Sequence, residues 1–264
     1  MKNLITAISL IILSSSCSKN NHMQIKNEAY KISETALEEF AKLKIFFGHQ
    51  SVGYNIIDGI KELSNNSNVL VNIKEVNDTS PISEACLSHV EIGTNFNPKS
   101  KIDDFVTKLD NGLADSLDVA ILKLCYVDIN AETDVAALIS YYTEKINYLQ
   151  SKYPHLTIVH CTSPLQENRY GMKETFLKLF GKKPLIFYHN AKRNEYNDLM
   201  LSAFGNTVFD IAKIESTVNN NRITYTLNGK EYFQMAGNYT NDGGHLNQIG
   251  SKVMAKELIA FLTK

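Results

Sequence analysis

Apolar positions recur along the chain with two different periods. Alternating or continuous apolar runs predict five strands, at 44–47, 69–76, 118–125, 155–161 and 207–211. Apolar residues three and four positions apart predict helices at 33–42, 52–63, 133–153, 189–204 and 246–262. Because a strand covered on both faces is apolar throughout, the alternation of these segments predicts a mostly parallel five-stranded sheet with helices on both sides.

Two stretches interrupt this alternation. The segment from Asp78 to Pro98 has no clear period, and we expect a loop there. The segment 223–233 has two alternating runs around Asn228-Gly229, which predicts a β-hairpin insertion near 222–234. No internal repeat is present, so the pattern predicts one α/β domain over 31–264.

The N-terminal residues have the composition of a secretory signal. Lys2 precedes an apolar run at 4–13, which is too short to span a bilayer, and three serines then lead to Cys17. This arrangement resembles a bacterial lipoprotein signal. The resemblance implies a signal peptide over 1–16, a lipid anchor on Cys17 and a polar tether over 17–30.

The same resemblance implies a location. Ser18 follows Cys17, which favours the outer membrane, so we expect a cell-envelope lipoprotein on its periplasmic or outer surface. Contact with the membrane would be through the lipid anchor only. The alternative is an ordinary secretory signal with an incidental cysteine and a secreted protein.

The charge balance excludes one class of partner. The 264 residues hold 27 Lys and Arg against 28 Asp and Glu, a formal net charge of −1, so no basic surplus indicates nucleic-acid binding. Four Cys are too few for a disulfide-built scaffold, and none forms a C-x-x-C pair. We therefore expect no metal site and no organic cofactor.

The residues at the predicted carboxyl ends of the strands suggest chemistry. Ser51 stands just after the first strand, and Asp242 and His245 stand just before the last helix. Each has a structural alternative, since Ser51 could cap the following helix and Asp242 the final one. In an open parallel sheet these segments reach the same edge, where a carboxylate beside an imidazole could activate a hydroxyl.

Two blocks of this sequence resemble those of the SGNH (GDSL-type) hydrolases. The first is 47–53 (FGHQSVG), the second is 242–250 (DGGHLNQIG), and Gly93 corresponds to the family's intervening glycine. The resemblance implies a flavodoxin-like three-layer α/β/α domain. It also implies Ser51 as nucleophile, His245 as base and Asp242 as its partner, with the backbone N–H groups of Ser51 and Gly93 forming an oxyanion hole.

The chain departs from the family in its third block. Val127 stands where the family has an oxyanion-stabilising Asn, and its side chain cannot donate a hydrogen bond. Asn95, two residues after Gly93, has the required amide, and we expect it to be the third donor, with Tyr126 and Lys123 as the alternatives. His49, Tyr126 and Asp128 are the predicted substrate contacts.

The expected function is hydrolysis of an acyl ester on an extracellular glycan or a related compound. The alternative is a catalytically impaired surface lipoprotein of the same fold that binds a glycan or another ligand. The missing Asn of the third block favours that alternative, and the retained Ser51, His245 and Asp242 oppose it.

Overall fold

A computed structural model describes residues 32–76, 80–169 and 182–264. The predicted signal peptide, the Cys17 anchor and the tether over 17–30 lie outside the described residues. Within the described ranges, no helix has both the length and the hydropathy needed to cross a membrane.

The centre of the molecule is a six-stranded parallel sheet. Its strands are β1 (Lys44–His49), β2 (Ile73–Glu75), β3 (Cys86–Glu91), β4 (Val119–Leu122), β5 (Thr157–Cys161) and β6 (Val208–Phe209). They are ordered β2-β3-β1-β4-β5-β6. Without the short edge strand β2, this is the flavodoxin-like order 2-1-3-4-5, so the predicted fold class is confirmed with six strands in place of five.

The prediction of a loop over 78–98 was wrong, because β3 lies within it. This strand pairs with β1 along its whole length, and the strand expected over 69–76 shortens to the edge strand β2. The reason is that β3 buries two polar residues. Ser88 donates to the Ile45 carbonyl at 2.7 Å, and His89 contacts another ring, so neither leaves an apolar pattern in the sequence.

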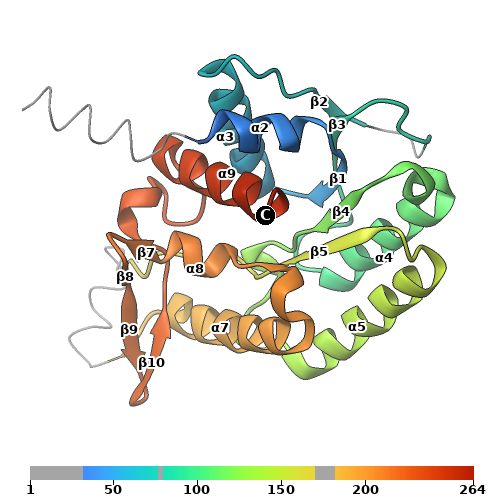
Figure 1. Cartoon of the computed structure of the whole chain (residues 1–264). Helices are drawn as coiled ribbons and strands as arrows, with labels where there is room; N and C mark the ends of the chain where they lie inside the picture. The colour runs from blue at the N-terminus through green and yellow to red at the C-terminus, as the bar shows by residue number, and fades with distance from the viewer. Residues whose placement is uncertain (1–31, 77–79, 170–181) are drawn as a thin grey trace, which may run out of the picture.

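Helices cover both faces of the sheet, as Figure 1 shows. One layer consists of α2 (Glu34–Ala41), α3 (Val52–Asn65), α8 (Ile211–Glu215) and α9 (Gln248–Leu262). The other consists of α4 (Pro98–Lys108), α5 (Val135–Lys152) and α7 (Leu185–Phe204). Helices α4 and α8 were not predicted. Single turns occur at Leu109–Leu113 (η1), Ala114–Ser116 (η2), Tyr126–Asp128 (η3), Gly205–Thr207 (η4) and Gly237–Tyr239 (η5).

Helix α3 directly follows Ser51 and fixes the position of that residue. Its inner face buries Ile56, Ile57 and Ile60 almost completely, which stabilises its position by about 1.5–3 kcal/mol per side chain. Gly59 lets it lie directly on α9, since a methyl group there would come within 2.2 Å of the Ser251 carbonyl oxygen. The first turn of α3 is therefore fixed relative to the C-terminal helix.

The predicted hairpin is confirmed. Strands β9 (Thr224–Leu227) and β10 (Lys230–Phe233) pair antiparallel, and Asn228 and Gly229 turn with φ of 50° and 79°. A second, shorter antiparallel pair is formed by β7 (Thr217–Val218) and β8 (Asn221–Arg222). The longer hairpin lies beside α7 in Figure 1, where the Tyr225 hydroxyl donates to the Phe187 carbonyl at 2.6 Å.

Candidate active site

Ser51 follows β1 at the carboxyl edge of the sheet in an uncommon backbone conformation. Its φ is 53° and its ψ is −107°, and its side chain makes no cap hydrogen bond to α3. A non-glycine residue held in such a conformation costs on the order of 1–3 kcal/mol and requires support from its surroundings. The structural alternative, in which the Ser51 hydroxyl caps the helix, is not what is found.

The Ser51 hydroxyl, the His245 ring and the Asp242 carboxylate form one line of hydrogen bonds. Ser51 Oγ lies 2.7 Å from His245 Nε2, and His245 Nδ1 lies 2.6 Å from Asp242 Oδ2. These are the contacts that a nucleophile, a base and an orienting carboxylate require. The imidazole and carboxylate side chains are 45% and 57% exposed, so the line is open to a substrate.

Asp242 is held by backbone donors as well as by the ring. Its Oδ1 accepts from the N–H groups of Gly244 and His245, each at 2.8 Å. Desolvation alone would raise the pKa of Asp242, but the two backbone bonds and the His245 ring outweigh it and hold the pKa well below its usual range. The carboxylate therefore stays ionised. Helix α9 is capped by Asn247, so Asp242 is not its cap.

Three polar side chains, Gln50, Lys123 and Asn55, hold the loops of the site together. Gln50 donates its amide to the carbonyls of Ile92 and Gly93 at 2.9 and 2.8 Å, which ties the Ser51 loop to the end of β3. The buried Lys123 ammonium donates to the Gln50 carbonyl at 3.2 Å. On the other side, the Leu246 N–H donates to Asn55 Oδ1 at 3.2 Å.

The predicted oxyanion role of the Gly93 N–H has to be corrected. This group donates to Asp104 Oδ2 at 2.9 Å, so it is already occupied. Gly93 has a φ of 51°, and a methyl group there would lie 2.5 Å from Lys101 N, which explains the glycine by close packing on α4. The Ser51 N–H, by contrast, is used in none of the hydrogen bonds among the described residues.

Asn95 is exposed, and one end of its amide is fixed. Its Oδ1 accepts from Lys101 Nζ at 2.8 Å, which leaves the Nδ2 group as the free donor.

The Lys101 ammonium also lies 2.6 Å from Asp128 Oδ2, and both charged side chains are fully buried. Asp128 also accepts from the N–H groups of Cys125 and Phe96 at 2.7 and 3.0 Å. Asp128 is thus a buried support of this loop, and the prediction that it contacts substrate was wrong.

His49 is also buried, so its prediction as a substrate contact was wrong. Its Nε2 lies 3.2 Å from His89 Nδ1, and it is completely covered from solvent. Burial, with Lys123 and His89 nearby, lowers the pKa of His49 to about 2, so the ring is neutral. It packs against Gly53, where a methyl group would come within 2.3 Å of the ring.

Tyr126 lies where a substrate contact was expected. Its ring meets the His245 ring edge to face at a centroid distance of 6.0 Å. Burial and the neighbouring Asp242 charge raise the pKa of Tyr126, so its hydroxyl keeps its proton and can donate. The buried Arg193 fixes the turn by donating to the carbonyls of Tyr126 and Ile129 at 2.9 and 3.1 Å.

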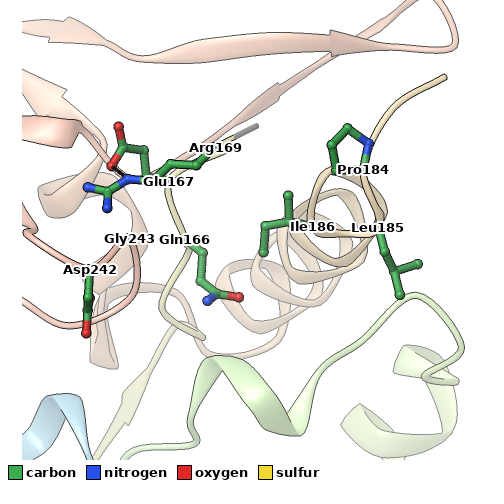
Figure 2. Close-up of a pocket in the computed structure, with 8 residues that line it drawn as sticks. All are labelled: Gln166, Glu167, Arg169, Pro184, Leu185, Ile186, Asp242 and Gly243. Carbon is green, nitrogen blue, oxygen red and sulfur yellow. Dashed lines mark hydrogen bonds and ion pairs between the residues drawn. The ribbon is translucent and has the colours of Figure 1, made fainter. Parts of the chain in front are cut away.

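Two cavities adjoin the triad. One of about 300 Å³ lies between the Asp242 loop and the start of α7, and Figure 2 shows Gln166 between these two walls. In that view the ion pair of Glu167 and Arg169, 2.5 Å long, lies on the same side as Asp242. The second cavity, of about 430 Å³, is lined by Phe96, Tyr126, Val127, Asn130, Ala131, Glu132, Gln166, Leu185, His189 and Arg193.

Metal-ligating side chains do not converge on the site. In residues 32–76, 80–169 and 182–264 no group of three or more His, Cys, Asp or Glu side chains could hold a metal ion. The three cysteines in these ranges, Cys86, Cys125 and Cys161, are buried free thiols.

Several solved structures are similar to this chain. A lipase/acylhydrolase from Enterococcus faecalis is 12% identical over 84% of this chain and 95% of that one, with a TM-score of 0.49. The periplasmic domain of a lipopolysaccharide acetyltransferase from Salmonella ser. Paratyphi A is 13% identical over 96% and 98%, with a TM-score of 0.47. A protein described as a lipolytic protein of the G-D-S-L family from Desulfitobacterium hafniense is 11% identical over 82% and 97%, with a TM-score of 0.44.

No family model matches the chain, and no curated protein matches it. Identities of 11–13% and TM-scores below 0.5 carry no chemistry from those structures to this one. The architecture is decided by the strand order, with Ser51 directly after β1 and the segment of Asp242 and His245 directly before α9. The chain has a flavodoxin-like α/β/α fold.

The sequence-based prediction did not include two further residues at this edge of the sheet, Gln166 and His189. Gln166 follows β5 at the carboxyl edge, where the rule that singled out Ser51 could have found it. His189 lies inside α7, and no local signal distinguishes it from an ordinary helix residue. Only the packing of α7 against the turn after β4 brings it to the cavity.

Proposed function

We propose that this protein is a serine ester hydrolase. The observation that supports it most directly is the continuous line from Ser51 Oγ through the His245 ring to Asp242, with contacts of 2.7 and 2.6 Å. A strained backbone at Ser51 fits the same proposal, because strain of this kind is concentrated at functional sites.

In the proposed reaction, Ser51 Oγ attacks the ester carbonyl carbon while His245 Nε2 takes the hydroxyl proton. His245 returns that proton to the alcohol oxygen as the C–O bond of the ester breaks, which leaves an acyl group on Ser51. Water then attacks the acyl carbon with the same ring as base, and the acid and free Ser51 are released. Asp242 keeps the ring oriented and stabilises its protonated form.

The negative charge on the carbonyl oxygen requires donors that are ready before the reaction. The Ser51 N–H is one, and the Asn95 amide, oriented by Lys101, is the second. The Tyr126 hydroxyl, beside the His245 ring, is the third candidate. This set replaces the Gly93 N–H, which Asp104 occupies, and the absent Asn at Val127.

We propose an acyl ester on an extracellular glycan, or a related ester, as the substrate. The expected secretory signal would bring the enzyme to such material. A formal net charge of −1 gives the protein no strong electrostatic field that would favour a charged substrate, which is compatible with an uncharged ester.

The test uses the purified full-length chain with a serine-reactive fluorophosphonate and with 4-nitrophenyl acetate. We expect labelling and hydrolysis, and we expect Ser51→Ala to abolish labelling and to lower kcat by at least about 10³-fold. Ser151→Ala, an exposed serine on α5, is the matched control and should behave as wild type. Hydrolysis that survives Ser51→Ala at the wild-type rate would refute the proposal.

A second candidate is a binding protein of the same fold without turnover. It is favoured by the two weakened oxyanion positions, the occupied Gly93 N–H and the apolar Val127. It predicts that wild type is neither labelled nor active, yet binds an acetylated oligosaccharide in calorimetry with unchanged affinity in Ser51→Ala.

The N-terminal proposals concern residues outside the described ranges. We propose that residues 1–16 are a signal peptide and that Cys17 carries the lipid that anchors the chain in the cell envelope. Metabolic labelling with a fatty-acid analogue should mark wild type and leave Cys17→Ser unlabelled. A labelled Cys17→Ser would exclude the anchor, and a cleaved but unlabelled wild type would indicate an ordinary secreted protein.

A further inference from the structure

The cavity of about 430 Å³ next to the triad has a wall that contacts the catalytic residues. Tyr126 forms part of that wall and meets the His245 ring. Phe96 forms another part and directly follows Asn95. A group bound in this cavity would therefore lie one side chain, Tyr126, away from the His245 ring.

His189 presents a donor to this cavity. Its Nδ1 accepts from the Ala131 N–H at 2.9 Å, so the neutral ring carries its proton on Nε2. Burial and the neighbouring Arg193 lower the pKa of His189, which favours that neutral form. No hydrogen bond among the described residues uses Nε2, and the ring lines the cavity.

Gln166 presents a second donor. Its backbone is fixed on both sides, since its N–H donates to Asn190 Oδ1 at 3.0 Å and its carbonyl accepts from Asn190 Nδ2 at 2.7 Å. Its side-chain amide and the Tyr126 hydroxyl both approach Gly244, where a methyl group would lie 3.2 and 2.9 Å from them. The absence of a side chain at Gly244 keeps both donors next to the triad.

The rim of the cavity is apolar. Phe96 and Leu185 are 75% and 63% exposed, and both line it. Phe96 is held at a φ of 65°, a conformation that is uncommon for a bulky residue. Two large apolar side chains left in solvent beside two half-buried donors indicate a ligand with both an apolar face and acceptor oxygens.

The charges of the cavity exclude a strongly ionic ligand. Its wall contains one guanidinium, Arg193, and one carboxylate, Glu132, so the two charges largely offset each other. Arg193 already donates to two carbonyls and to Asn190 Oδ1. A purely apolar chain is also excluded, because it would leave the His189 and Gln166 donors without hydrogen-bond partners. Unpaired donors lower the affinity of a site for a ligand that lacks the matching acceptors.

We infer that this cavity binds the alcohol portion of the substrate as an uncharged, hydroxylated ring such as a sugar, and that His189 Nε2–H and the Gln166 amide determine this specificity. The inference rests on the proposed ester hydrolysis. The apolar C–H face of the ring lies against Phe96 and Leu185, while its oxygens accept from the two donors. His189 is a specificity-determining residue and takes no part in proton transfer at Ser51.

The test compares two esters with the same acyl group, a mono-O-acetylated methyl glucoside and 4-nitrophenyl acetate. We expect His189→Ala to lower kcat/KM for the sugar ester by about 10–100-fold, mainly through KM, and to change the other ester by less than about 2-fold. His189→Gln, which retains a donor, should recover part of the loss. Tyr188→Ala, exposed and outside the cavity lining, is the matched control.

Two results would overturn the inference. One is an equal effect of His189→Ala on both esters, or no effect on either. The other is a gain of activity on 4-nitrophenyl octanoate over the acetate in His189→Ala, which would place the acyl chain in this cavity.

A binding measurement separates failure of the inference from failure of the proposed function. Calorimetry of the sugar ester with Ser51→Ala and with Ser51→Ala/His189→Ala requires no turnover. If wild type hydrolyses neither ester but binding depends on His189, the hydrolase proposal fails and the sugar subsite stands. If Ser51-dependent hydrolysis occurs but binding does not depend on His189, the subsite fails and the hydrolase stands.

Discussion

Two neighbouring regions at the carboxyl edge of the sheet use polar side chains in opposite ways. In the outer region, Asp242 and His245 are about half exposed and are positioned by short hydrogen bonds. In the inner region, Lys101 and Asp128 are fully buried and paired with each other. Asp242 and His245 can be reached by a substrate, whereas Lys101 and Asp128 are shielded from solvent and contact only protein.

Because of this difference, substitutions in the outer region should change the reaction rate, and substitutions in the inner region should change the stability of the fold. Removing an exposed group of the triad should affect reaction rate and leave folding intact, because solvent replaces the lost contacts. Removing one member of a buried pair leaves its partner charged and unpaired in the interior, which is among the most destabilising changes known. Substitutions in the two regions should therefore have opposite signatures.

The largest expected effect is on the rate in Asp242→Asn. The oxygen of the new amide would stay with the Gly244 and His245 N–H groups, so its NH2 group would donate to the His245 ring. The ring proton would then be on Nε2, where the ring cannot take the Ser51 proton. In Ser-His-Asp enzymes this change lowers kcat by about 10⁴-fold. The free energy of unfolding at pH 7 should stay within about 1 kcal/mol of wild type. Steady-state kinetics and urea unfolding of the same preparation measure both. A rate within tenfold of wild type would contradict the assigned role.

The second effect is on stability in Asp128→Ala. The Lys101 ammonium would be left buried without its carboxylate, and we expect a loss of about 3–5 kcal/mol in urea unfolding. The double variant Lys101→Met/Asp128→Leu should be more stable than the single variant, because it removes both charges. If the single variant is as stable as wild type, the ion pair is not the support that the buried contacts indicate.

The third prediction concerns Asn95, which lies between the two regions. Asn95→Asp keeps the oxygen that accepts from Lys101 and removes the free N–H donor. We expect kcat to fall by about 10²–10³-fold with little change in KM, as for the loss of one oxyanion donor. Lys99→Ala, an exposed neighbour, is the control. An unchanged kcat in Asn95→Asp would remove this residue from the oxyanion hole.

The smallest expected effect is the pH dependence of stability at Glu215. Burial raises the pKa of this carboxyl to about 8, although the Leu165 N–H, Lys123 and Arg193 act against the rise. Between about pH 4.5 and 8 the folded state keeps a proton that the unfolded state releases, so this group's contribution to stability falls as the pH rises.

Glu215→Gln cannot titrate, so its stability relative to wild type should increase by about 2 kcal/mol from pH 5 to pH 6.5. Urea unfolding of both proteins at the two pH values measures the difference. The comparison between proteins cancels the opposite trend of His160, whose pKa burial lowers to about 4. A pH-independent difference would show that Glu215 is ionised in the folded state.

Local signals were sufficient for the parts of the site that lie at the ends of elements. Ser51, Asp242 and His245 could be predicted because parallel strands bring their carboxyl ends to one edge. Strand β3 could not, since its buried Ser88 and His89 give it a polar pattern. For the same reason, His49 and Asp128 were wrongly predicted as substrate contacts, although both side chains are buried in the protein.

The sequence by itself determined the alternation of strands and helices outside β3, α4 and α8, the hairpin around Asn228-Gly229 and the three residues of the proposed triad. Only the tertiary structure decided that His49 and Asp128 are buried supports and that His189 and Gln166 line the neighbouring cavity. The physical reason is that hydrophobic periodicity records which face of an element is covered on average. Whether a particular polar side chain faces protein or substrate depends on the neighbours that other elements bring to it.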